Sequence, residues 1–275
     1  MRRADRAEVR ARLATRQPRP VLDAAHRVSV VVPVFHGAAT IGTTIERVRA
    51  ELGPLVDGSL EVVVVDDGSA DGTAEAARAA GADQVLVQPV NRGKGAAVRR
   101  GMLAARGAAL AFTDADLAYG PAQIARLVEA VEDGWDVVVG NRHHADTTQV
   151  VAAPLLREVG GRVVNAATRA VVHGGYADTQ CGLKAFRADV ARLLFGAAHV
   201  DGFAFDIELF WLAERCGLSV LEVPVEVENS DVSTVRVARD AGRLFADLAR
   251  IRLDAWRGRY QPDPAALAAL RSNGS

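Results

Sequence analysis

The stretch LEVVVVDDGSADGT, residues 60–73, places an unbroken apolar run directly before a polar segment with two glycines. A valine-rich run of this length is typical of a strand that is buried on both faces of a parallel sheet. The Asp-Gly-Ser and Asp-Gly-Thr triplets that follow are typical of turns and helix caps. The stretch therefore predicts a strand at 60–65, a polar turn, and a helix at 73–80.

Strand patterns and helix patterns alternate on both sides of this unit, from residue 28 to about residue 150. Such alternation predicts an α/β domain in which a mostly parallel sheet carries helices on both faces. A further helix is expected to begin at Pro121, because proline is favoured at the first helical position. The other predicted strands lie at 28–34, 84–87, 108–112, 136–139 and 218–227, and the other predicted helices at 39–52, 95–105, 155–172, 205–216 and 234–256; residues 174–186 are predicted to form a glycine-rich loop or irregular strand.

Composition places the 275-residue chain among ordinary globular proteins, because 49% of its residues are hydrophobic and 24% are charged. The formal net charge of -1 disfavours nucleic acid as a partner. No apolar run approaches the roughly 20 residues of a membrane-spanning helix, so we expect any membrane contact to be peripheral. Two cysteines suit a reducing compartment such as the cytoplasm. Only Lys94 and Lys184 are lysines, which we interpret as a compositional bias without functional weight.

Polar or acidic clusters follow three predicted strands, and the carboxyl ends of parallel strands meet at one edge of a sheet. Asp114 and Asp116 form one such cluster, separated by a single alanine. Two carboxylates this close repel each other unless a cation or proton offsets them. Oxygen ligands suit Mg²⁺ or Mn²⁺, which often take substrate phosphates as remaining ligands. A capped turn is the alternative, but the position after a buried strand favours a metal site.

The two other clusters are candidates for contact with a nucleotide. Asp66 and Asp67 could accept hydrogen bonds from a base or ribose, or could cap turns, and the two roles are compatible. Residues 91–95 offer close backbone approach at Gly93 and Gly95 and a cation at Lys94, or form a tight turn with a solvated lysine. Neither the P-loop pattern nor a G-x-G-x-x-G after the first strand is present, which disfavours ATPases and dinucleotide dehydrogenases.

These segments together resemble the inverting GT-A glycosyltransferases of family 2. The resemblance rests on Pro33-Val34-Phe35, Asp66-Asp67-Gly68-Ser69 with Asp71-Gly72-Thr73, Asn91-Arg92-Gly93-Lys94-Gly95 and Asp114-Ala115-Asp116, in the family's order and spacing. Residues 178–186 and 205–209 resemble the dolichyl-phosphate glucosyltransferase and mannosyltransferase branch. The match covers roughly residues 28–258. It implies a GT-A (Rossmann-like) three-layer αβα sandwich with a C-terminal amphipathic helix.

The resemblance also implies an activity and a division of the chain. The activity is inverting transfer of a hexose, with glucose favoured, from UDP-glucose or alternatively GDP-mannose to a polyprenyl (dolichyl-type) phosphate. It would take place on the cytoplasmic side, at the inner face of the plasma membrane. The expected division is a charged N-terminal arm at 1–27, the catalytic domain at 28–232, an amphipathic helix at 233–260 and a tail at 261–275.

Residue roles are carried over from the family position by position. The implied donor-site residues are Pro33, Phe35, Asp66, Asp67, Gly68, Ser69, Asn91, Gly93, Lys94 and Asp114. The implied metal ligands are Asp114 and Asp116, the implied acceptor-phosphate residues Arg142 and Arg157, and the implied catalytic residues Asp178 and Gln180. A surface ion pair is the alternative for Arg142. A buried network that holds loops together is the alternative for Asp178, and for Asp206 it is the favoured interpretation.

The sequence departs from the family pattern at two places. His36-Gly37 replaces the Asn-Glu that often follows the first motif, and Ala118 stands where mannosyl-type relatives carry a metal-binding glutamine, which weakens the mannose interpretation. His143 and His144 receive no role.

Three competing functions remain open. They are a family 2 transferase with a soluble or cell-wall acceptor, a catalytically silent nucleotide-sugar binding protein, and a sugar nucleotidyltransferase. The intact Asp114-Ala115-Asp116 disfavours the second, and the third lacks a glycine-rich, arginine-containing loop after the first strand. The C-terminal helix could pack on the catalytic domain, which is favoured, or dock on an anionic membrane surface.

Overall fold

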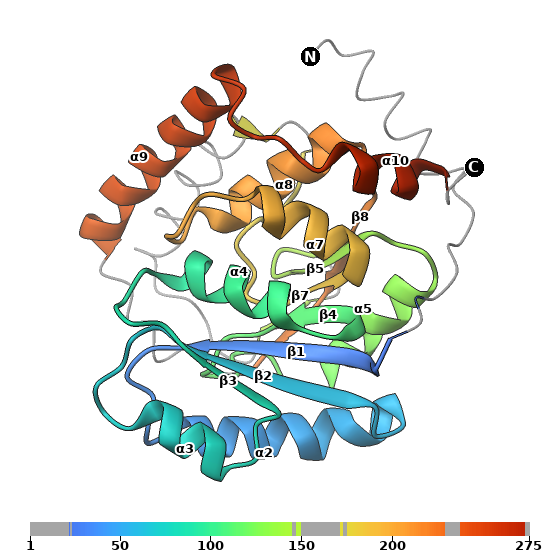
Figure 1. Ribbon diagram of the computed structural model, residues 1–275. Coiled ribbons are helices and arrows are strands. Elements are labelled where there is room, and N and C mark those ends of the chain that lie inside the picture. The colour runs from blue at the N-terminus through green and yellow to red at the C-terminus, as the bar shows by residue number, and fades with distance from the viewer. Residues whose placement is uncertain are drawn as a thin grey trace.

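The computed structural model describes Leu22 and residues 24–144, 147–149, 171–172, 175–228 and 237–272. A twisted sheet lies at its centre, with helices on both faces (Figure 1). Most of the predicted N-terminal arm, nearly all of the predicted helix at 155–172, and Arg157 lie outside the described residues.

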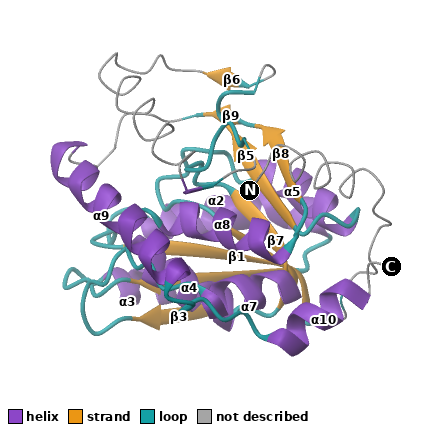
Figure 2. Ribbon diagram, turned by 90° about the horizontal axis from the view of Figure 1, so that it is seen from above, coloured by secondary structure: helices purple, strands orange, loops and turns teal. Residues whose placement is uncertain are grey.

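Seven strands form the sheet, in the order β3-β2-β1-β4-β7-β5-β8. Only β7 pairs antiparallel with its neighbours, β4 and β5, among the strands described, so the prediction of a mostly parallel sheet is confirmed. The strands are β1 (His26–Val34), β2 (Leu60–Asp66), β3 (Gln84–Val87), β4 (Gly107–Phe112), β5 (Val137–Asn141), β7 (Lys184–Arg187) and β8 (Val220–Pro224). A separate short pair joins β6 (Thr148–Gln149) to β9 (Glu226–Val227) and lies beyond the sheet in Figure 2.

Helices form a layer on each side of the sheet, with further helices outside. They are α2 (Ile41–Leu52), the short 3₁₀ helix η1 (Gly53–Val56), α3 (Thr73–Ala79), α4 (Lys94–Ala104), α5 (Gln123–Glu132), α7 (Ala188–Ala197), α8 (Phe205–Cys216), α9 (Val237–Trp256) and α10 (Pro264–Ser272). One apolar core joins the sheet to α2 and α5, and the other joins it to α4, α7 and α8.

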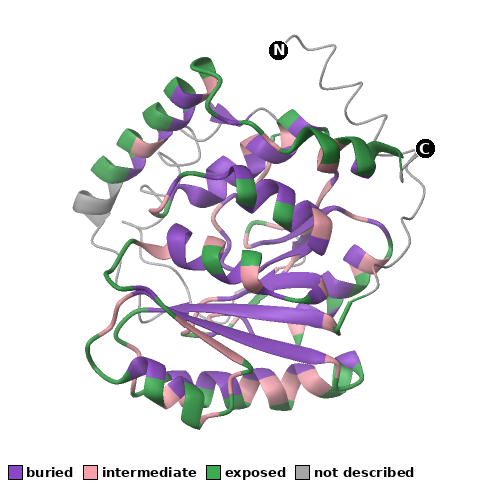
Figure 3. Ribbon diagram, viewed as in Figure 1, coloured by how far each residue is buried: buried purple, intermediate pink, exposed green. Residues whose placement is uncertain are grey.

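The valine run of β2 is apolar at every position because both of its faces are covered. Val62 and Val64 belong to the core on the α2 side, whereas Val63 and Val65 belong to the core on the α4 side. Alternate strand side chains point to opposite faces, so an unbroken apolar run is what a central strand requires. The purple strands of Figure 3 show this double burial.

Two α-helices were not predicted, and each has a physical reason. α7 begins directly after β7 ends at Arg187, and this N-cap residue is not one of the types that mark a helix start in sequence. In α10, which lies in the predicted tail, Leu270 is buried against the core and the helix continues to Ser272. In the described part of the predicted segment 174–186, residues 175–183 form a loop, and the last residues enter the sheet as β7.

The long helix α9 packs on the domain through one face. Leu244, Leu248 and Ile251 join the core on the α4 side, as the packing interpretation expects. Phe245 and Trp256 of the same helix are exposed instead. Of the helices described, none has the length and apolar character needed to cross a membrane.

Candidate active site

The residues predicted to bind the donor and the metal gather where β1, β2 and β4 end, at one edge of the sheet. Val34 pairs with Asp66, so the ends of β1 and β2 lie side by side. The Nζ atom of Lys94, at the start of α4, lies 2.5 Å from Oδ1 of Asp114, which follows β4. The expectation that these clusters share one edge is confirmed.

Hydrogen bonds tie the loop after β1 to the loop after β2. The backbone N–H of His36 donates to Oγ of Ser69 at 2.8 Å, and that of Gly37 donates to Oγ1 of Thr73 at 2.9 Å. Asp66 accepts the N–H of Ser69 at 2.9 Å, so it caps the turn. Beside these loops the Phe35 ring is 47% exposed, which leaves it free to stack on a ligand.

Asp67 holds the following loop in place. Its Oδ1 accepts Gln88 Nε2 at 2.6 Å and the Arg92 N–H at 2.8 Å, and its Oδ2 accepts the Gly93 N–H at 2.8 Å. Gly68 lies so close to this loop that a Cβ there would be 2.6 Å from the Val90 carbonyl carbon, at a φ of +80°. The Asp67 carboxylate, expected to contact the donor, is thus already engaged in positioning residues 91–93.

The glycines of residues 91–95 serve a packing role. A Cβ on Gly93 would lie 2.6 Å from the Asp201 carbonyl oxygen, and one on Gly95 would lie 2.6 Å from that of Val200. The sequence suggested that these glycines let a ligand approach the backbone. In the structure they let the segment before α8 approach it, because no side chain would fit between.

Charges of alternating sign line the site. Burial disfavours the Lys94 ammonium, but Asp114 and Asp206 outweigh it and raise the pKa of Lys94. Burial and the neighbouring Asp114 raise the pKa of Asp116. A Cβ at position 182 would overlap the Asp114 carboxylate, so the glycine at this position leaves room for that side chain. A nearby cation would therefore stabilise the ionised form of Asp116.

Lys184 belongs to a buried charge network beside the site, and the sequence analysis gave it no role. Its Nζ lies 2.7 Å from Oδ1 of Asp206 and 2.6 Å from the Cys181 carbonyl oxygen, and its side chain is 1% exposed. The favoured interpretation of Asp206 as part of a buried network is thus confirmed. Both lysines of the chain lie close enough to Asp206 to favour its carboxylate. Lysine is rarely buried without a partner. The position of Lys184 directly before the apolar Ala185-Phe186 was therefore the sequence feature that could have indicated a buried ion pair.

Asp178 and Arg142 form a two-pronged ion pair. Nε and Nη2 of Arg142 lie 2.6 and 2.9 Å from the two carboxylate oxygens, and the Arg142 N–H donates at 3.1 Å. Burial works against the Asp178 carboxylate, but Arg142 outweighs it and lowers the pKa of Asp178. Arg142 therefore forms an ion pair, as its alternative interpretation expects, and 38% of the Arg142 side chain remains exposed. Gln180 donates its N–H to Asp178 at 3.1 Å.

Asp114 and Asp116 fit a divalent cation in part. The described residues contain no group of three or more His, Cys, Asp or Glu side chains that could hold a metal by themselves. Two carboxylates with water and phosphate oxygens are nevertheless a donor set that suits Mg²⁺ or Mn²⁺. The buried, like-charged surroundings of Asp116 favour such an ion.

Comparison with known proteins decides the family. The profile described as Glycosyl transferase family 2 matches residues 29–195, more than half of the chain. The chain belongs to glycosyltransferase family 2. It is therefore a nucleotide-sugar-dependent glycosyltransferase, and the catalytic motifs predicted from its sequence lie within or directly beside the matched region.

Individual relatives support this assignment. The family 2 enzyme is 34% identical over 255 residues to the dolichyl-phosphate beta-glucosyltransferase of Drosophila melanogaster, covering 84% of this chain and 77% of that protein. It is 29% identical to the human protein of that name, covering 84% and 78%.

A solved structure shares its fold. Glucosyl-3-phosphoglycerate synthase from Mycobacterium tuberculosis, in complex with Mn²⁺, UDP and glucosyl-3-phosphoglycerate, gives a TM-score of 0.62 at 25% identity and covers 94% of this chain and 85% of that one. The similarity confirms the GT-A fold and supports the use of a divalent cation.

Proposed function

We propose that this enzyme transfers glucose from UDP-glucose to a dolichyl-type polyprenyl phosphate, with inversion at the anomeric carbon. The observation that carries the proposal is the Arg142–Asp178 pair. Arg142 lowers the pKa of Asp178, which makes this carboxylate a poor base near neutral pH. A phosphate acceptor needs little help from a base, because its second pKa is about 6 and it is already anionic.

Acceptor binding follows from the same pair. Two nitrogens of Arg142 are held by Asp178, which fixes the orientation of the guanidinium group. The exposed part of the side chain keeps further N–H donors for phosphate oxygens. Asp178 and Gln180 accordingly orient the acceptor, and Arg157 is proposed as a second phosphate contact.

Donor binding is assigned to the loops after β1, β2 and β4. Phe35 and Pro33 border the base. Ser69, Asn91 and the remaining lone pairs of Asp66 and Asp67 serve the base and ribose. An ionised carboxylate has about four acceptor sites, and Asp67 uses three of them within the chain.

The leaving group is a diphosphate, and positive charge must oppose it. Lys94, kept charged by Asp114 and Asp206, lies at the sheet edge for this purpose. A Mg²⁺ or Mn²⁺ ion held by Asp114 and Asp116 would supply further neutralisation of the departing phosphates.

Membrane contact is proposed through the outer face of α9. Phe245, Leu253 and Trp256 are 46%, 42% and 84% exposed. Phe245, Arg252 and Trp256 lie within about 40° of one another around a helix with 3.6 residues per turn. Aromatic side chains beside arginine suit an anionic membrane surface. This arrangement supports contact with an anionic membrane surface, which we propose is the inner face of the plasma membrane, where the lipid acceptor would be.

A soluble phosphate-bearing acceptor is the second candidate. It is favoured by structural similarity to glucosyl-3-phosphoglycerate synthase, with a TM-score of 0.63 and 25% sequence identity. That enzyme has been solved in complex with phosphoglyceric acid.

One experiment separates the candidates. The protein is incubated with Mg²⁺, labelled UDP-glucose or GDP-mannose, and a short polyprenyl phosphate, phosphoglyceric acid or no acceptor. Label that enters the organic phase from UDP-glucose supports the proposal. UDP release with water-soluble acceptors alone supports the second candidate. Donor binding without turnover on any acceptor contradicts both and leaves a nucleotide-sugar binding protein.

A further inference from the structure

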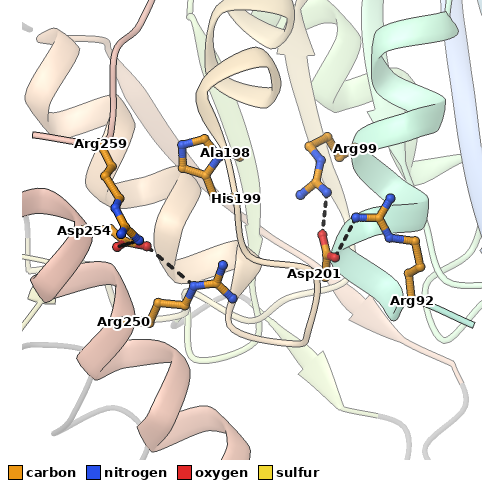
Figure 4. A pocket seen from close by; sticks show the side chains of 8 residues that line it. All are labelled: Arg92, Arg99, Ala198, His199, Asp201, Arg250, Asp254 and Arg259. Atoms are coloured by element: carbon orange, nitrogen blue, oxygen red, sulfur yellow. Dashed lines mark hydrogen bonds and ion pairs between the residues drawn. The ribbon is translucent and has the colours of Figure 1, made fainter.

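A pocket of about 590 Å³ lies between the start of α4, the segment 198–201 and the C-terminal half of α9. Its charged lining consists of four arginines, Arg92, Arg99, Arg250 and Arg259, and two aspartates, Asp201 and Asp254 (Figure 4). Lys94 and Arg99 are about 140° apart around α4, at 3.6 residues per turn. The pocket and the Lys94–Asp114 pair thus use different faces of this helix.

Each carboxylate in the pocket is shared by two arginines. Asp201 pairs with Arg92 at 3.0 Å and also with Arg99. Asp254 pairs with Arg259 at 2.9 Å and with Arg250 at 3.5 Å. Since arginine remains charged and the two carboxylates are ion-paired, the lining carries an excess of two positive charges.

The arginines keep donors for a ligand. The side chains of Arg92, Arg250 and Arg259 are 51%, 58% and 57% exposed. Each guanidinium group carries five N–H donors, and the pairs above engage few of them. Figure 4 shows the guanidinium group of Arg250 lying between the Asp254 end and the Asp201 end of the pocket.

The floor of the pocket is held rigidly. Glu208 accepts the N–H groups of His199 and Val200, each at 2.9 Å, and the hydroxyl of Tyr260 at 2.7 Å. The Asp201 carbonyl oxygen accepts the N–H of Ala96 at 3.2 Å. The backbone on which the charges stand is therefore preorganised, which lowers the entropic cost of binding.

We propose that this pocket is a second anion site, which binds a phosphate monoester group independently of the donor site. The planar fork of arginine matches phosphate oxygens. A phosphate monoester carries a charge of about −1.5 to −2 at pH 7, which balances the excess charge of the lining. A bound phosphate bridges α4 and α9 and so fastens α9 to the catalytic domain. The proposal does not depend on the identity of the sugar acceptor.

The test is a titration of the full-length protein with inorganic phosphate by calorimetry. The variant Arg92→Gln/Arg250→Gln removes one arginine from each aspartate, so that Arg99 still pairs with Asp201 and Arg259 with Asp254. Arg126→Gln is the control, because Arg126 is exposed on α5 and does not line the pocket. Circular dichroism verifies the fold of each variant. If the glutamine variant does not fold, Arg92→Lys/Arg250→Lys replaces it, since lysine keeps the charge and loses the fork.

The wild type and Arg126→Gln are expected to bind phosphate at this site with equal affinity. The double variant is expected to bind about ten-fold more weakly or worse, because charge-assisted hydrogen bonds are lost. Equal phosphate affinity in all variants, or no phosphate binding by the wild type, overturns the proposal.

A second arm identifies the source of the phosphate group. Vesicles of phosphatidylcholine with phosphatidic acid are compared with vesicles that carry the same charge as phosphatidylglycerol. Preferential binding to phosphatidic acid that the double variant loses supports a lipid headgroup. Binding of free phosphate without that preference supports a soluble ligand.

Discussion

Arg142, just after β5, and Asp178, in the loop before β7, are joined by two parallel contacts, with Nε 2.6 Å from Oδ2 and Nη2 2.9 Å from Oδ1. Asp178 is 2% exposed, whereas 38% of the Arg142 side chain is exposed. The pair therefore anchors a cation whose outer side can meet a ligand.

Replacing this arginine by lysine tests its geometry. Arg142→Lys keeps the charge but cannot make both contacts, so the acceptor phosphate is misplaced. We expect kcat/KM to fall by about 100-fold, in line with the cost of small misplacements at reacting centres. Steady-state kinetics with polyprenyl phosphate measure this. An unchanged kcat/KM would remove Arg142 from the acceptor site.

The pH dependence of stability follows from Asp178. Because its folded pKa is lowered, this carboxylate contributes stability at pH values above its unfolded pKa of about 3.9. That contribution is lost as the pH falls through the lower folded pKa. Comparing urea unfolding of the wild type and Asp178→Asn between pH 7 and pH 3, we expect the difference in free energy to shrink toward acid pH. A constant difference would contradict the ion-pair interpretation.

Asp116→Asn separates metal binding from folding. We expect loss of most Mg²⁺-dependent turnover, about 100-fold or more, because one of two carboxylate ligands is neutralised. Without metal, the melting temperature should not fall, since burial and Asp114 disfavour the ionised side chain. Retained metal-dependent turnover would refute the assignment of Asp116 as a ligand.

The buried Lys184–Asp206 pair predicts a non-additive effect on stability. Lys184→Met leaves Asp206 without its cation and should cost about 3–5 kcal/mol in the free energy of unfolding. Lys184→Met/Asp206→Leu removes both charges and should recover much of that loss. Urea denaturation measures the wild type, Lys184→Met, Asp206→Leu and the double variant, which together form a double-mutant cycle. Additive losses would show that the two side chains do not interact.

Two glycine substitutions should have opposite effects. A Cβ at Gly95 would lie 2.6 Å from the Val200 carbonyl oxygen and 2.7 Å from Phe205 Cβ, so Gly95→Ala should destabilise by about 1–3 kcal/mol. A Cβ added at Gly196, in α7, would meet no atom of the described residues within 4 Å, and Gly196→Ala should stabilise by about 0.5–1 kcal/mol. Thermal denaturation compares the two, and equal effects would contradict the packing at Gly95.

Membrane contact by α9 predicts a loss of vesicle binding. Phe245→Ser/Trp256→Ser should weaken flotation with anionic vesicles by about ten-fold or more, because each buried aromatic side chain contributes about 1.5–3 kcal/mol. Leu55→Ser is the matched control, as Leu55 is 50% exposed on η1. Equal flotation of all three proteins would argue that α9 only packs against the domain.

The amino-acid sequence alone was enough to predict most strands of the sheet, their parallel pairing and the edge that holds the site, but not the interior antiparallel strand β7. Those features depend on local patterns, such as the valine run of β2 and the acidic residues that follow β2 and β4. Burial of a strand and the turn after it are encoded within a few consecutive residues.

How the polar atoms of the site are used became evident only from the folded arrangement. Asp67 positions residues 92 and 93, Lys184 neutralises Asp206, and Arg142 meets Asp178 across 36 positions of sequence. Packing of the elements also placed Leu244 of α9 in the core and left Trp256 exposed. Hydrogen bonds and ion pairs join side chains that are distant in sequence, so their partners are settled only when the elements pack together.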